Sequence, residues 1–205
     1  MAQEAQALLD AFVAQPDDPT LAARFDGLID EYANGPVNDL IALYLGRGAV
    51  SYMNDPRGAL AAYTRVTQLS PDHKEAHNYC GILHHRLGNL KEAQAEYDTV
   101  LALAEAEKDD LAKAAALGNL GKIVATRGDL TAAERYYEQA LKLNQELGRK
   151  EGMAKNYTNL GILADTRGDL AAARAFWVQA RDLYAEIGMP HMVEKVQESL
   201  DGLDD

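Results

Sequence analysis

The chain contains few of the residues that cross-link a protein, interrupt its helices or anchor it in a membrane. Among 205 residues there is one cysteine, Cys80, so no intrachain disulfide can form, which suits a reducing compartment. There are six prolines, and no segment alternates apolar with polar residues as a half-buried strand does. No apolar run approaches the roughly 20 residues that a membrane-spanning helix needs. The composition therefore predicts an all-α protein without membrane insertion.

Basic residues are also scarce. Twenty Lys and Arg residues oppose 32 Asp and Glu residues, which gives a formal net charge of −12. This charge disfavours binding to nucleic acid or to an anionic membrane, so no nucleic-acid partner is expected. It favours solubility, and a basic peptide partner is the alternative interpretation. The first residues show no basic region followed by an apolar core, so we expect no signal peptide and a cytoplasmic location.

A block of residues recurs with a spacing of 40. Asn119-Leu120-Gly121 returns as Asn159-Leu160-Gly161, and Arg127-Gly128-Asp129-Leu130 returns as Arg167-Gly168-Asp169-Leu170. A weaker copy lies a further 40 residues upstream, around Gly81. Self-similarity at such a period is typical of stacked arrays, in which each unit buries its apolar face against its neighbours.

Each 40-residue unit is predicted to be two helices joined by a tight turn. In the third unit, apolar and small residues at i, i+3, i+4 and i+7 predict a helix from about Asp110 to Thr126. Gly128 is expected to end that helix in a left-handed conformation, and Asp129 to cap the next one. Small residues are expected where two helices cross closely, at Gly121, Gly161, Ala133 and Ala173.

The predicted organisation has three parts. Residues 1–36 form an N-terminal helical hairpin or degenerate repeat, and whether they pack onto the array is left open. Residues 37–187 contain four repeats, at about 40–73, 74–113, 114–153 and 154–187. The first repeat is irregular, because Gly46 and Gly48 both compete for the glycine position. Residues 188–205 form a capping helix, for which a dimer contact through the same apolar face is the alternative.

These residues resemble the tetratricopeptide repeat, a helix-turn-helix unit, and the 40-residue form is similar to the repeats of Pins-type cell-polarity adaptors. The resemblance implies a right-handed α-solenoid that binds a peptide or protein. The residues that carry it are the helix-crossing glycines Gly81, Gly121 and Gly161, the turn glycines Gly88, Gly128 and Gly168, and the aromatic residues Tyr97, Tyr137 and Trp177.

The resemblance places a ligand on the concave surface lined by the first helix of each repeat. In related arrays, the asparagine before the Leu-Gly pair bonds the backbone of an extended ligand, a task that suits an amide because it both donates and accepts. Asn119 and Asn159 are the leading candidates; alternatively, these amides bond a neighbouring helix. The other predicted groove residues are Lys122, Lys155, Ile162, Asn78, Ile82, Arg86, Tyr44 and Tyr52.

One constellation of potential metal ligands needs an explanation. His73, His77, Cys80 and His84 lie on one side of a predicted helix, and imidazole and thiolate are Zn²⁺ ligands. They extend over about 16 Å along the helix, too far for one ion to collect all four. His77, Cys80 and His84 also occupy the positions expected to face the packed neighbouring helix. We therefore predict no metal site and no cofactor.

No spacing of nucleophile, base and acid suggests catalysis. The sequence therefore predicts a non-enzymatic adaptor that binds a partner peptide or helix, possibly basic, in its groove, and a monomer is favoured over a homo-oligomer. Two alternatives stay open. One is a self-assembling structural protein that stacks end to end, and the other is a regulatory subunit that controls a partner enzyme.

Overall fold

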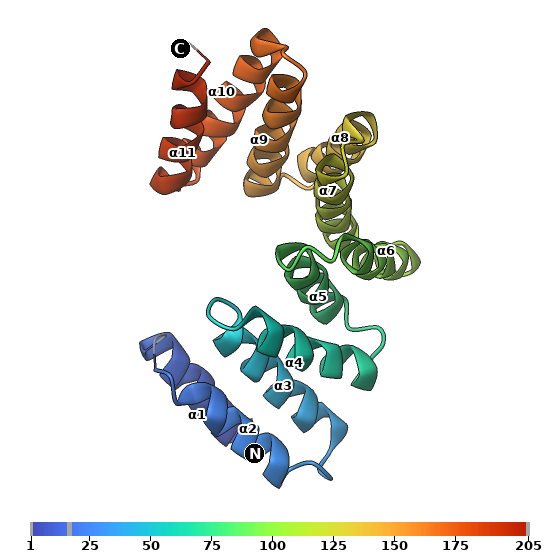
Figure 1. Cartoon of the computed structure of the whole chain (residues 1–205), viewed down its shortest axis with the longest axis vertical. Coiled ribbons are helices and arrows are strands. Elements are labelled where there is room, and N and C mark those ends of the chain that lie inside the picture. Colours follow the sequence, from blue (N-terminus) through green and yellow to red (C-terminus); the bar gives the residue numbers. More distant parts are fainter. Residues whose placement is uncertain (1, 16–17, 204–205) are drawn as a thin grey trace. The chain divides into compact units, whose positions relative to one another are not determined.

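The computed structural model describes residues 2–15 and 18–203, which form helices and no strand (Figure 1). Residues 1, 16–17 and 204–205, which belong to the predicted N-terminal and C-terminal segments, lie outside the described residues. The helices are α1 (Ala2–Ala14), α2 (Leu21–Glu31), α3 (Val37–Ser51), α4 (Pro56–Leu69), α5 (Lys74–Arg86), α6 (Leu90–Glu107), α7 (Asp110–Thr126), α8 (Leu130–Glu146), α9 (Lys150–Thr166), α10 (Leu170–Glu186) and α11 (Pro190–Asp201).

The chain divides into two compact units, residues 1–99 and 100–205, and the division falls inside α6. In the first unit, α1 and α2 pack against each other and both contact α3, while α4 contacts α3 and α5. The open question about the N-terminal segment is thereby answered: its two helices pack onto the first repeat. Leu21 and Phe25 of α2 are fully buried in this contact region with Leu43 of α3.

In the second unit, each helix packs against the next one along the chain from α7 to α11, and α7 also contacts α9. Figure 1 shows α9, α10 and α11 side by side. Val196 and Leu200 of α11 are buried in one cluster with Trp177 and Tyr184 of α10. The apolar face of α11 therefore packs against α10, and the role of α11 as a cap of the array stays a prediction. The all-α fold of stacked helical hairpins is confirmed, and α7 has the predicted bounds.

The predicted turn chemistry is also confirmed. Gly128 and Gly168 have φ angles of 87° and 78°, a left-handed conformation that glycine adopts without a steric penalty. The side chain of Asp129 accepts a hydrogen bond from the backbone N–H of Ala132 at 2.9 Å, which caps α8. The turn therefore ends one helix and starts the next within three residues.

A glycine lies directly against an aromatic ring in each repeat hairpin. A Cβ atom at Gly121 would lie 2.6 Å from Cε1 of Tyr137, and one at Gly81 would lie 2.5 Å from Cε1 of Tyr97. No side chain fits there, so the crossing helices approach as closely as the ring allows. Gly161 makes the equivalent contact with Trp177.

The irregular first repeat follows the same rule. A Cβ atom at Gly48 would lie 2.7 Å from Cζ of Tyr63 in the same hairpin, whereas Gly46 lies against Phe25 of the preceding helix α2. The two glycines therefore serve two different helix crossings and do not compete for one position.

The glycine contact predicts opposite effects for two substitutions on α7. Gly121→Ala should lower the free energy of unfolding by about 1–3 kcal/mol, because the added methyl group overlaps the Tyr137 ring. Gly118→Ala should raise it by about 0.5–1 kcal/mol, since alanine favours a helix interior. At Gly118 a Cβ atom meets only Oδ1 of Asn156, at 3.6 Å. Urea unfolding followed by circular dichroism measures both, and equal effects would contradict this account of the helix crossing.

Candidate functional site

The predicted ligand-contacting residues of the second unit lie on α7 and α9, two helices that contact each other. Asn119 and Lys122 lie three residues apart on α7, and Asn159 and Ile162 repeat that spacing on α9. Lys155 lies one turn before Asn159, on the same side of its helix. Ile162 is 50 % exposed, which is high for an isoleucine in a packed helix. These five residues are here called the α7–α9 surface.

Two ammonium groups dominate the charge of the α7–α9 surface. Lys155 forms an ion pair with Glu151 at 2.5 Å, one turn earlier on α9. Lys122 has no ion pair within the described part of the chain, and the residue is exposed. Enough protein nevertheless surrounds it that desolvation lowers the pKa of Lys122, and the charge of Lys155 lowers that pKa further. The two lysines are thus close enough to repel, and Lys122 lacks an acidic neighbour to balance it.

Asparagine amides lie beside these lysines. Asn159 is partly buried and its side chain makes no hydrogen bond to any described residue, whereas Asn119 interacts with another group of the protein. Asn156, on the same helix as Asn159, is 4 % exposed, and its Nδ2 has no hydrogen-bond partner. Its Oδ1 lies 3.6 Å from the position of a Cβ at Gly118, so this amide packs against α7. The α7–α9 contact therefore contains amide groups with unused hydrogen-bonding capacity.

In the first unit, the predicted residues of α5 are Asn78, Ile82 and Arg86. A guanidinium N–H of Arg86 donates to the backbone carbonyl of Tyr52 at 2.7 Å, and the guanidinium carbon lies 5.3 Å from the centroid of the Tyr52 ring. Arg86 therefore holds the end of α3 against α5 by a hydrogen bond and a cation–π contact. Asn78 interacts with another group of the protein, and Ile82 is partly buried.

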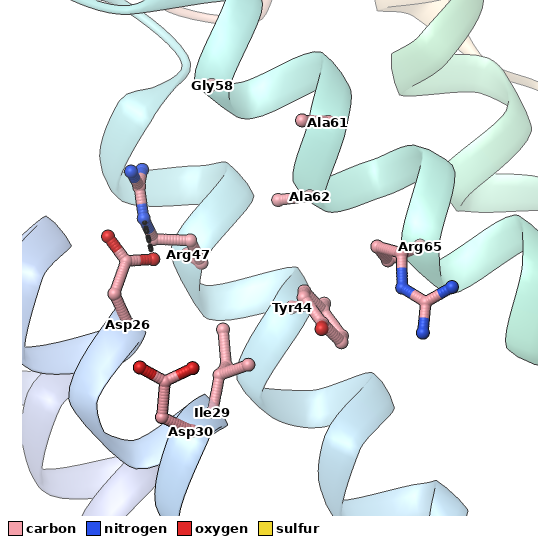
Figure 2. Close-up of a pocket in the computed structure, with 9 residues that line it drawn as sticks. All are labelled: Asp26, Ile29, Asp30, Tyr44, Arg47, Gly58, Ala61, Ala62 and Arg65. Atoms are coloured by element: carbon pink, nitrogen blue, oxygen red, sulfur yellow. Dashed lines mark hydrogen bonds and ion pairs between the residues drawn. The ribbon is translucent and has the colours of Figure 1, made fainter. Parts of the chain in front are cut away.

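Tyr44 and Tyr52 lie in different surroundings. Tyr44 lines a pocket of about 360 Å³ between α2, α3 and α4, shown in Figure 2. There the guanidinium carbon of Arg65 lies 5.8 Å from the centroid of the Tyr44 ring, and Arg47 forms an ion pair with Asp26 at 2.7 Å. Tyr52 instead meets Tyr79 of α5 edge to face, with ring centroids 5.6 Å apart. The two tyrosines, predicted to share one groove, therefore contact different helices.

Sequence reasoning missed one residue at an equivalent position. Counting 40 residues back from Asn119 leads to Tyr79, whereas Asn78 is the counterpart of Gly118. The repeat spacing indicated Tyr79 as the equivalent of Asn119, but Asn78 was chosen because it has the same side chain as Asn119. The stacking of Tyr79 on the Tyr63 ring, with centroids 4.7 Å apart, could not be found from the sequence.

The histidine and cysteine side chains have separate partners. His73 accepts from the backbone N–H of Ala76 and caps α5. His77 Nδ1 lies 2.6 Å from Oε2 of Glu96 on α6, and its Nε2 lies 3.0 Å from the carbonyl oxygen of Pro71. Cys80 is buried, and burial raises the pKa of its thiol to about 12.

His77 and Cys80 therefore face neighbouring segments, as predicted. Within residues 2–15 and 18–203, no group of three or more His, Cys, Asp or Glu side chains is placed to hold a metal ion.

Comparisons with known proteins agree on the repeat. The tetratricopeptide repeat profile matches residues 75–146 and 124–186, which together cover more than half of the chain. No curated protein matches the sequence. In the described residues, no helix has the length and apolar character to cross a membrane.

Three solved structures illustrate the similarity in fold. MamA 41-end from Desulfovibrio magneticus RS-1 has a TM-score of 0.68 at 17 % identity, covering 90 % of this chain and 96 % of that one. BtubC (BKLC) from P. vanneervenii has a TM-score of 0.62 at 17 % identity, covering 96 % and 91 %. PilW, a widely conserved type IV pilus biogenesis factor, has a TM-score of 0.65 at 18 % identity, covering 97 % and 91 %. At these identities the similarity is one of fold alone.

The His77–Glu96 pair predicts a pH-dependent stability. The hydrogen bond to Glu96 is the main reason that the pKa of His77 is raised above its ordinary value. The stability that this interaction adds is therefore fully present below the ordinary histidine pKa of about 6.5. It is lost as the pH rises through the higher pKa of His77 in the folded protein. Glu96→Gln should cost about 1.5–3 kcal/mol at pH 6 and less at pH 9.

Urea unfolding at the two pH values measures this cost. Glu92→Gln, an exposed substitution on the same helix, is the matched control. A cost of Glu96→Gln that stays constant between pH 6 and pH 9 would be inconsistent with a charged His77.

Proposed function

Because this chain belongs to the tetratricopeptide repeat family, we propose that it is a non-enzymatic adaptor that binds a segment of a partner protein on the α7–α9 surface. The repeat serves as a scaffold for protein–protein interaction, and the first helices of successive repeats present their outer residues to a partner. The observation that carries the proposal is the paired placement of Lys122 and Lys155 beside Asn119 and Asn159.

Each group on the α7–α9 surface suits one feature of a peptide. The amide of Asn159 has no protein partner in the described residues, so it is available to donate to and accept from a ligand backbone. The half-exposed Ile162 offers an apolar contact whose burial on binding is favourable. Lys122 is partly desolvated and has no acidic partner, so a carboxylate of the ligand would stabilise its ammonium group. An extended segment or helix containing an acidic residue fits all three.

The local charge at this surface outweighs the net charge of the chain. The net charge of −12 on its own favours a basic ligand. At physiological ionic strength, however, exposed charges are screened beyond about 8 Å, so a ligand on the α7–α9 surface responds mainly to Lys122, Lys155 and the Glu151 carboxylate paired with Lys155, which together leave one net positive charge. We therefore propose an acidic rather than a basic segment as the ligand of this surface.

The proposal predicts that binding depends on the first-helix amides. In a pull-down from native cell extract, Asn119→Ala/Asn159→Ala should lose a partner that the wild-type chain retains. The matched control is Gln139→Ala/Gln179→Ala, which removes two exposed amides, also spaced by 40 residues, from the second helices α8 and α10. A partner lost from both double variants, or from neither, would place the interaction elsewhere.

A second measurement tests the sign of the ligand charge. With the recovered partner segment, Lys122→Gln/Lys155→Gln should weaken binding roughly 2- to 30-fold, as expected for two exposed ion pairs. Wild-type affinity should also fall as salt rises. Affinity that is unchanged by the double substitution would exclude the proposed acidic contact.

A further inference from the structure

A second hollow, of about 310 Å³, lies in the first unit and has mainly apolar walls. Leu9 of α1, Leu45 and Ala49 of α3 and the ring of Tyr79 on α5 contribute to these walls. It is separate from the pocket around Tyr44, because the two share no lining residue. Neither the repeat motifs nor the α7–α9 surface accounts for it.

A nearly buried tyrosine lines this hollow. Tyr63 belongs to α4, and the contact of its Cζ with Gly48 shows that the end of its ring passes beneath α3. The side chain is 3 % exposed, and Tyr63 lines the hollow. Its hydroxyl has no hydrogen-bond partner among the described residues, yet it is not one of the fully enclosed polar atoms. A polar group in such a position is poorly satisfied unless a ligand or water reaches it.

A carboxylate completes the polar side of the hollow. Glu75, in the first turn of α5, is exposed, lines the hollow and forms no ion pair with a described residue. Burial is the main cause that raises the pKa of both Tyr63 and Tyr79, and the negative charge of Glu75 contributes to both shifts. The carboxylate therefore lies near the two tyrosines. The Tyr79 ring stacks on Tyr63, and both rings line the same mainly apolar hollow as Glu75.

We propose that this hollow binds the side chain of a lysine or arginine of a partner protein. The aliphatic stem would lie on Leu45, Ala49 and the Tyr79 ring, and the cation would lie between the Glu75 carboxylate and the Tyr63 hydroxyl. Glu75 is the one Asp, Glu, Lys, Arg or His among the residues that line the hollow, so the lining carries a negative charge without a counterion. A cationic head on an apolar stem matches this arrangement.

Other side chains fit less well. An aliphatic side chain would shield the hydroxyl and the carboxylate from water without replacing their hydrogen bonds. An acidic side chain would be repelled by Glu75. The proposal concerns the first unit and does not depend on the α7–α9 surface, whose expected ligand has the opposite charge.

The test uses the full chain and three small probes followed by methyl and amide NMR. Nα-acetyl-arginine N-methylamide should shift the methyl resonances of Leu45 and Ala49, with a Kd in the low millimolar range, roughly as expected for a fragment. The citrulline and norleucine analogues, which have similar length and no charge, should bind at least about 5-fold more weakly. Binding of the arginine probe should weaken as salt rises.

Variants of the chain identify the groups responsible. Glu75→Gln should reduce the affinity for the arginine probe to that for the citrulline probe. Tyr63→Phe keeps the ring beneath Gly48 and removes only the hydroxyl. It should lower the affinity for the arginine probe and leave the affinity for the uncharged probes unchanged. Asp98→Asn, which removes an exposed carboxylate of α6 outside the hollow, should change nothing. Asn119→Ala/Asn159→Ala should also bind the probe normally, which separates this site from the proposed adaptor surface.

Three outcomes would overturn the proposal. The first is equal affinity for the charged and uncharged probes, which would mean an apolar occupant. The second is unchanged binding in Glu75→Gln with a native-like methyl spectrum. The third is the absence of shifts at Leu45 and Ala49 at tens of millimolar probe, a concentration at which a fragment of this kind saturates its site, since 10 mM is about tenfold above a Kd of 1 mM.

Discussion

The contact between a first-helix glycine and an aromatic ring of the second helix is the constraint on which the rest of the structure depends. At Gly121 the missing Cβ lets the backbone of α7 lie on Tyr137, which is 3 % exposed. One large side chain is thereby buried at a small helix separation, and the hydrophobic gain holds the hairpin together. Because this contact fixes which side of α7 faces inward, it also fixes which side carries Asn119 and Lys122. The placement of these two residues is thus a consequence of the packing.

Repetition of one contact leaves the exposed positions free to differ in chemistry. The position of Lys122 on α7 is taken by Ile162 on α9, and the position of Asn119 is taken by Tyr79 on α5. The second unit consequently presents ammonium and amide groups, whereas the first presents tyrosines and Glu75. A chain with strongly negative net charge can therefore offer local surfaces of both signs, because screening limits each ligand to the charges nearest to it.

Residues that deviate from the repeat pattern are explained by the groups that they contact. Gly46 and Gly48 look redundant in the sequence, yet each lies against a different aromatic ring, Phe25 and Tyr63 respectively. His77 occupies a position that is apolar elsewhere in the array, and it is accommodated because Glu96 and the Pro71 carbonyl both accept from its ring. A polar residue at a packing position is tolerated when its hydrogen bonds are satisfied.

The sequence by itself determined the helices, the turns and the glycine crossings. These follow from interactions within a few residues, as in the capping of α8 by Asp129, or from a periodic pattern that repeats them. It also indicated which positions of α7 and α9 face outward. Only the tertiary structure decided that Tyr44 and Tyr52 contact different helices, that Lys122 is partly desolvated, and that Tyr63 and Glu75 line one hollow. Those outcomes depend on contacts between residues far apart in the chain, which no local spacing encodes.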